Sequence, residues 1–223
     1  MRRSAQIMAG HGFIVALPEI YHEFEPAGTA FSYEGSAGVD RGNELKITKS
    51  IEAYDSDSAS SVAFLASHPN CTGVVGVMGF CIGGHLAYRA ALNKGVRAAA
   101  CFYATDLHKG TLGAGMNDDS LARVGELAQS GVEMCMIWGR QDPHVPNDGR
   151  LRTLTAFTNA NVNFTWHEFN GQHAFMRDEG HRYDGELALH CYRMCVDLFR
   201  RKLGAGDLPV PATASTAAGE SKH

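Results

Sequence analysis

The hexapeptide at residues 79–84, Gly-Phe-Cys-Ile-Gly-Gly, constrains the fold of this chain more than any other stretch. Residues 74–78 before it are short, apolar and β-branched, which predicts a fully buried strand, and residues 85–92 after it predict a helix. A strand that becomes a helix within a few residues must turn sharply. Glycines at 79, 83 and 84 leave room for that turn and for the close approach of strand and helix.

Such a turn would leave the Cys81 sulfur at the N-terminal end of a helix. Free main-chain N–H groups and the positive end of the helix dipole favour a thiolate there. The N–H of Ile82 is placed to donate to an oxyanion. The pattern therefore predicts a nucleophile elbow in which Cys81 stands where serine is also common. The alternative is a buried structural cysteine in a tight connection, because free cysteine packs as a small apolar residue.

Buried strands alternate with helices along the rest of the chain. We expect strands at 13–18, 74–78, 97–103, 132–138 and 162–169, and helices at 2–11, 44–53, 55–67, 85–92, 120–130, 147–159 and 183–203. Aspartates 55 and 57 are expected to cap the third helix, and residues 19–43 to form a long loop. The fold class predicted is α/β, with a mostly parallel, right-handed sheet flanked by helices.

Composition limits the organisation and the partners of the chain. With 44% apolar and 20% charged residues, residues 1–204 are expected to form one domain. Residues 205–223 are rich in Ala, Pro, Ser and Thr and are expected to be a disordered tail. The net charge of −4 argues against nucleic acid as a partner. No apolar run reaches 18 residues, and residues 1–6 lack the apolar core of a secretory signal, so no membrane partner is expected.

The cysteines are scattered, at positions 71, 81, 101, 135, 191 and 195, and form no C-x-x-C pair. This usage predicts reduced thiols and a cytoplasmic protein. Cys191 and Cys195 lie one helical turn apart and could ligate a metal, but two positions on one helix face favour core packing. We expect no metal and no organic cofactor.

Three residues follow predicted strands in the order nucleophile, acid, base: Cys81, Asp142 and His173. In a parallel sheet the chemistry lies at the carboxyl ends of the strands, so these side chains can meet. His173 would take the thiol proton, and Asp142 would orient the imidazole. Each has another interpretation, since Asp142 before Pro143 is also a good turn residue. The other candidate bases are His144, His167 and His181.

The chain resembles the dienelactone hydrolase family of α/β-hydrolases over about residues 5–203. The resemblance is carried by residues 79–84, 139–146 (GRQDPHVP), 173–177 (HAFMR) and 13–21, which include Pro18-Glu19-Ile20-Tyr21. It implies that Cys81, Asp142 and His173 are nucleophile, acid and base. It also implies that Arg177 holds a substrate carboxylate, with Arg41 as a second, looser match. The alternative for Arg177 is a surface arginine paired with Asp178 or Glu179.

The sequence departs from that family at its N-terminus. Family members carry further strands there, including one between the strands that match residues 13–18 and 74–78. A loop of that region supplies a second oxyanion donor and a glutamate that helps to deprotonate the nucleophile. Omitting a central strand leaves two rows of main-chain groups without partners. We therefore expect either an incomplete version of a longer protein or a sheet that closes differently, with weak activity.

Together these features predict a hydrolase of small, anionic lactones, esters or thioesters that uses a Cys-Asp-His triad. Its partner would be a small-molecule substrate, and the sequence indicates no oligomeric state. Two other functions stay open. The chain could be a catalytically inactive binding or regulatory protein on the same fold, or a thiol redox sensor that uses Cys81 without hydrolysis.

Overall fold

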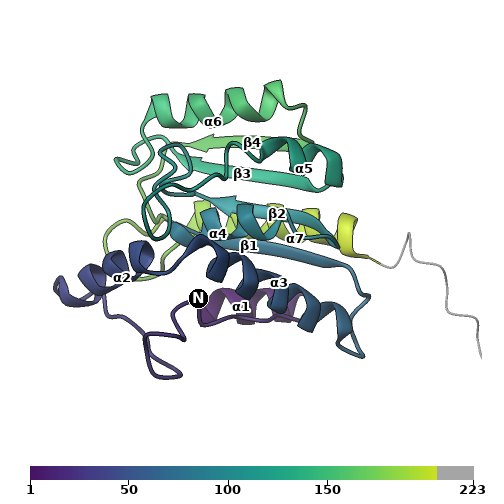
Figure 1. Cartoon of the computed structure of the whole chain (residues 1–223), viewed down its shortest axis with the longest axis horizontal. Coiled ribbons are helices and arrows are strands. Elements are labelled where there is room, and N and C mark those ends of the chain that lie inside the picture. The colour runs from purple at the N-terminus through teal and green to yellow at the C-terminus, as the bar shows by residue number, and fades with distance from the viewer. Residues whose placement is uncertain (205–223) are drawn as a thin grey trace, which may run out of the picture.

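The computed structural model describes residues 1–204; the expected disordered tail, residues 205–223, lies outside them. The described chain contains a four-stranded sheet of order β1-β2-β3-β4, and all three strand pairs are parallel. Figure 1 shows the strands side by side, with α1 and α3 next to the β1 edge. The elements are α1 (Arg2–Gly10), α2 (Ala37–Thr48), α3 (Ile51–Ser67), β1 (Val75–Phe80), α4 (Ile82–Ala90), β2 (Val96–Phe102), α5 (Val124–Ser130), β3 (Glu133–Gly139), α6 (Asn147–Asn159), β4 (Phe164–Phe169) and α7 (Gly185–Leu203).

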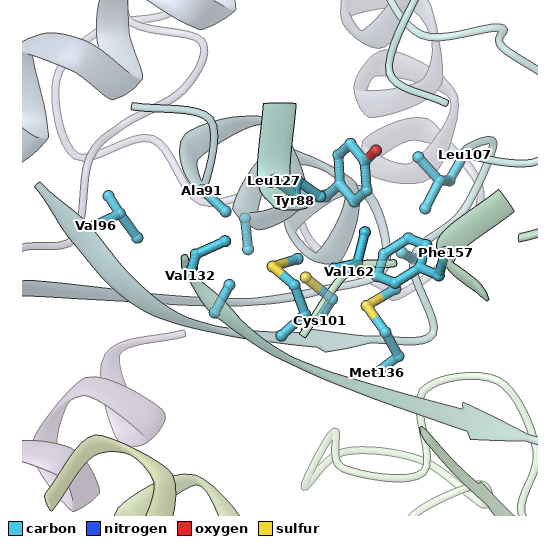
Figure 2. Packing of buried hydrophobic residues seen from close by; sticks show 14 of the residues in the cluster. Tyr88, Ala91, Val96, Cys101, Leu107, Leu127, Val132, Met136, Phe157 and Val162 are labelled. Carbon is cyan, nitrogen blue, oxygen red and sulfur yellow. The ribbon is translucent and has the colours of Figure 1, made fainter. Parts of the chain in front are cut away.

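Helices cover both faces of the sheet, as strands with near-continuous apolar sequence require. On one face, side chains of α3, α4, α5 and α6 pack against alternate residues of the strands, such as Cys101 and Met136. Figure 2 shows Tyr88 and Phe157 of this layer beside the same two side chains. On the other face, α1 and α7 pack against the residues that alternate with these, such as Ala100 and Ile137. The predicted parallel α/β architecture is confirmed.

Close main-chain contact at the turn after β1 explains two of its three glycines. A Cβ atom on Gly79 would lie 1.9 Å from the carbonyl oxygen of Gly83, and one on Gly84 would lie 2.5 Å from the carbonyl oxygen of Phe102. A Cβ on Gly83 would meet nothing within 4 Å. The prediction that glycine is needed for space is therefore right for positions 79 and 84 and wrong for 83.

The predicted strand at residues 13–18 is wrong. These residues are extended but form no strand, and residues 14–18 make no main-chain hydrogen bond within the described chain. Ile14, Val15 and Leu17 are exposed. An apolar stretch becomes a strand only where a neighbour satisfies its N–H and C=O groups, and none of the four strands pairs with residues 13–18.

The predicted boundaries around residue 50 are also wrong. The expected loop at 19–43 ends early because α2 begins at Ala37, and α3 begins at Ile51. Ser50 caps α3, and its side chain accepts a hydrogen bond from the N–H of Ala53. Asp55 and Asp57 lie inside α3 and form ion pairs instead.

The remaining predicted strands and helices are present, with ends that shift by a few residues. The helix expected from residue 120 begins at Val124, and the helix expected at 147–159 has those bounds. The last helix begins after Asp184, whose side chain accepts from the N–H of Leu187. In the part of the chain that the structure describes, no helix is both long and apolar enough to cross a membrane.

Candidate active site

Cys81 occupies the bend between β1 and α4, as predicted. It has φ +59° and ψ −122°, a conformation that non-glycine residues rarely adopt and that costs about 1–3 kcal/mol. Its N–H donates to the carbonyl of Phe102 at 3.0 Å, which ties the bend to the end of β2. The sulfur is left at the N-terminus of α4, whose first residue is Ile82.

Cys81, His173 and Asp142 form one continuous chain of hydrogen bonds. Nε2 of His173 lies 3.2 Å from Sγ of Cys81, and Nδ1 of His173 lies 2.7 Å from Oδ2 of Asp142. The three residues follow β1, β4 and β3, whose carboxyl ends meet at one edge of the sheet. The structure therefore brings the three predicted residues together with the contacts that a nucleophile, base and acid need.

The Asp142 carboxylate is fixed by its own loop. Its second oxygen accepts hydrogen bonds from the N–H groups of His144 at 2.7 Å and Val145 at 3.3 Å. The loop after β3 is joined to the loop after β4 by the N–H of Gln141, which donates to the carbonyl of Gly171. The turn geometry considered as the alternative role of Asp142 thus coexists with its contact to His173.

The charges of the Cys81–His173 pair favour proton transfer to the imidazole. Burial alone would raise the pKa of the Cys81 thiol, but the hydrogen bonds and charge of His173, with smaller contributions from Thr105 and Ile82, hold it below its ordinary value. Burial would lower the pKa of His173, but its bonds to Asp142 and Cys81 raise it to about 9. Both shifts favour a proton on the His173 imidazole rather than on the Cys81 sulfur.

The other candidate histidines do not contact the sulfur. The ring of His144 packs edge-on against that of His173, with centroids 4.5 Å apart. His167 lies on β4 and stacks on Phe169. His181 is exposed in the loop before α7.

A cavity of about 1330 Å³ opens beside Cys81. One side is β1 with the start of α4, and the opposite side is the extended stretch at 13–18 and the turns that follow it. Arg177 also lines it. Its guanidinium lies 4.0 Å from the centre of the Tyr33 ring, and no ion pair within residues 1–204 involves it. The expected alternative partner Asp178 pairs with Arg3, and Glu179 offers only its carbonyl.

Arg41 does not join this group. Its Nε donates to Glu25 at 2.7 Å and its guanidinium to Glu44 at 2.9 Å. It is also absent from the residues that line the cavity beside Cys81.

Two residues near the triad have no counterpart in the sequence-based predictions. The hydroxyl of Thr105 lies 3.7 Å from Sγ of Cys81, and the Tyr103 ring packs edge-on against His173 with centroids 5.1 Å apart. Both follow the end of β2, so their only signal in the sequence is a position just after a buried strand.

One cluster of possible metal ligands occurs in the described chain, at His22, Glu23 and Asp57. The ammonium group of Lys49 contacts both carboxylates, so a protein cation already offsets part of their charge. All six cysteines are free, and Cys191 and Cys195 are buried in the core.

Comparison with known proteins identifies the family. The model of the dienelactone hydrolase family matches residues 1–203. The chain belongs to the dienelactone hydrolase family. A Saccharomyces cerevisiae protein, provisionally assigned as a carboxymethylenebutenolidase, is 40% identical over 208 residues, which cover 91% of this chain and 75% of that protein. A carboxymethylenebutenolidase of Pseudomonas sp. is 23% identical over 203 residues, with 90% and 78% covered.

Solved structures place this dienelactone hydrolase family member in the α/β-hydrolase fold. A dienelactone hydrolase-like promiscuous phosphotriesterase from metagenomic libraries superposes with a TM-score of 0.69, at 16% identity, over 91% of this chain and 80% of that one. A structure from Klebsiella pneumoniae, provisionally assigned as a dienelactone hydrolase, has a TM-score of 0.57 at 20% identity and is covered to 62%. The predicted family and fold are confirmed, and family membership supports hydrolase activity.

Proposed function

We propose that this chain hydrolyses small, anionic esters, lactones or thioesters with Cys81 as nucleophile, His173 as base and Asp142 as acid. The observation that carries the proposal is the hydrogen-bonded chain Asp142–His173–Cys81, with 2.7 Å and 3.2 Å between its atoms. Family membership independently supports hydrolysis. No step requires a metal or an organic cofactor.

In the proposed reaction, the proton of the Cys81 thiol resides on His173 and the thiolate attacks the carbonyl carbon of the substrate. The N–H of Ile82 donates to the oxyanion that forms. As the tetrahedral intermediate collapses, the bond to the leaving oxygen or sulfur breaks, and His173 returns the proton to that atom. His173 then takes a proton from water, the hydroxide attacks the thioester, and the acid leaves as the Cys81 thiolate re-forms.

Arg177 supports the preference for an anion. Its guanidinium has no acidic partner in the described chain and faces the cavity that also contains Cys81. A planar guanidinium binds a carboxylate through two parallel hydrogen bonds. Arg41, also expected at this site, would first have to leave Glu25 and Glu44.

The decisive test is an acylation burst with p-nitrophenyl acetate, measured for the wild-type protein and for Cys81→Ala. We expect one equivalent of p-nitrophenol per chain in a fast phase, followed by slower turnover, and loss of both phases in the variant. A folded wild-type protein without a burst would favour the binding or regulatory function instead. A burst without turnover, with thiol oxidation unaffected by His173→Ala, would favour the redox function.

We also propose a cytoplasmic location. All six cysteines are free thiols, and Cys81 must remain reduced to act as a nucleophile. Loss of activity on mild oxidation, with recovery by dithiothreitol, would agree with this requirement.

A further inference from the structure

Thr105 contacts the nucleophile through both its main chain and its side chain. Its N–H donates to the carbonyl of Cys81 at 3.3 Å, and its hydroxyl lies 3.7 Å from Sγ. The residue is nearly buried, at 8% exposed, so water does not readily replace this contact. Within the described residues, the Thr105 hydroxyl has a hydrogen-bond contact only with Cys81.

A buried histidine holds Thr105 in this position. Nδ1 of His85 lies 2.9 Å from the Thr105 carbonyl, which can only accept, so the Nδ1–H donates. The opposite nitrogen of His85 lies 2.9 Å from Oγ of Ser120, to which Arg89 also donates. His85, Arg89 and Ser120 are buried, so the arrangement connects α4 to the loop after β2 without relying on solvent.

We propose that Thr105 is a further catalytic residue of this site: its hydroxyl donates a hydrogen bond to the Cys81 sulfur whenever that sulfur carries negative charge, and His85 positions Thr105 to do so. This inference rests on the proposed function. A thiolate has no proton and can only accept, so the hydroxyl hydrogen must point toward it. The sulfur then has two side-chain partners, Thr105 and His173.

The hydrogen bond acts at the two points where charge builds on sulfur. One is the resting thiolate before attack, and the other is the thiolate that leaves when the acyl-enzyme is hydrolysed. Hydrogen bonds to an ionised acceptor are about twice as strong as those to a neutral one, so the bond favours these states over the neutral thioester. Tyr103 and Tyr21 line the same cavity as Cys81, and burial raises the pKa of each phenol above its ordinary value. Both therefore stay neutral near pH 7.

The test compares Thr105→Val, which removes the hydroxyl at nearly constant shape, with Thr105→Ser, which keeps it. Both are made in a Cys71→Ser background, because Cys71 and Cys81 are the two cysteines that are not buried. The readout is the rate of iodoacetamide alkylation against pH, which gives the pKa of the Cys81 thiol without any need for turnover. We expect Thr105→Val to raise that midpoint by about one pH unit, and Thr105→Ser to stay near the wild type.

The outcomes separate this inference from the proposed function. A midpoint that does not move in Thr105→Val, or one that moves equally in Thr105→Ser, would overturn the role of the hydroxyl. A shift in Thr105→Val alone supports it, even if the wild-type protein shows no burst with p-nitrophenyl acetate, in which case the proposed function fails instead. Thermal melts show whether each variant is folded, and Thr105→Ala provides the same comparison should the valine variant unfold.

Discussion

Two sides of the cavity are built in different ways. The triad side consists of β1, the start of α4 and the loop after β4, and main-chain hydrogen bonds such as Cys81 N–H to Phe102 and Arg140 N–H to Phe169 tie the strand ends behind it together. The N-terminal side consists of the extended residues 13–18, where residues 14–18 make no main-chain hydrogen bond in the described chain. Hydrogen bonds of the sheet fix the triad side, whereas residues 14–18 of the N-terminal side have no main-chain hydrogen bonds in the described chain to fix them.

The reacting residues of the cavity therefore lie on the hydrogen-bonded side, and the other side only encloses the cavity. The reacting atoms of Cys81 and His173 depend on the register of paired strands, so their spacing is set wherever the sheet forms. The boundary of the cavity on the N-terminal side depends on exposed apolar side chains such as Ile14 and Leu17. Changes on the triad side should therefore affect acylation or folding strongly, and changes on the N-terminal side should affect both weakly.

The largest effect is expected at the base. His173→Ala should slow the acylation burst by about 10³-fold, because general-base catalysis is lost. Alkylation gives a second readout. In the wild type, the alkylation rate should fall only as the pH drops through the lowered pKa of Cys81, while His173 stays protonated up to about pH 9. Without the imidazolium, the midpoint should rise toward the ordinary thiol value.

His144→Ala is the matched control for that variant. Its ring touches His173, but no hydrogen bond joins it to the sulfur. It should leave the acylation rate within the same order of magnitude. If the two alanine variants were equally slow, the base could not be assigned to His173. The expectation that acylation depends specifically on the triad side would then be wrong.

A pair of glycine variants tests the rigidity of the triad side. Gly79→Ala places a methyl group against the Gly83 carbonyl, 1.9 Å away, and main chain cannot yield cheaply. We expect it to lower the free energy of unfolding by about 3 kcal/mol. Gly83→Ala meets open space in the first turn of α4 and should change it by less than about 1 kcal/mol. Urea denaturation of both proteins measures the difference, and equal effects would mean that the turn is not tightly packed.

The sequence predicts the triad side well for a physical reason. A buried strand, a glycine-rich turn and a polar residue after the strand are local features, and parallel strands carry such residues to one edge. The sequence alone could therefore predict that Cys81, Asp142 and His173 lie at the same edge of the sheet, without any measured distance between them. The N-terminal side fails because an apolar stretch at 13–18 shows a preference for burial but not whether a partner strand is present.

Thr105 illustrates a different limit. It lies in a loop with no motif, and only the three-dimensional contact at 3.7 Å distinguishes it from its neighbours. Arg41 shows the same limit from the other direction, since the charge that fits the resemblance is engaged by Glu25 and Glu44 in the structure. Side-chain pairing in loops depends on tertiary contacts that spacing in the sequence does not encode.

A smaller effect is expected for anion recognition. Arg177→Met should lower kcat/KM for an aryl ester with a free carboxylate by about 10- to 100-fold, because a charge-assisted hydrogen bond is lost. It should leave a neutral ester with the same leaving group almost unchanged. Arg41→Met is the control, since its guanidinium binds two carboxylates of the protein. If Arg41→Met lost the anionic substrate selectively and Arg177→Met did not, the two assignments would have to be exchanged.

The smallest effect is expected on the N-terminal side. Leu17 is 43% exposed and Leu127, in the core, is 0% exposed, so the same truncation to alanine compares an unpaired segment with a packed one. Leu127→Ala should lower the free energy of unfolding by about 2–5 kcal/mol through lost burial and a cavity. Leu17→Ala should lower it by about 0.5 kcal/mol or less. If urea denaturation gave similar losses of unfolding free energy for the two variants, the side chains of residues 13–18 would have to be packed in solution. Other groups beside β1 would then have to fill much of the cavity.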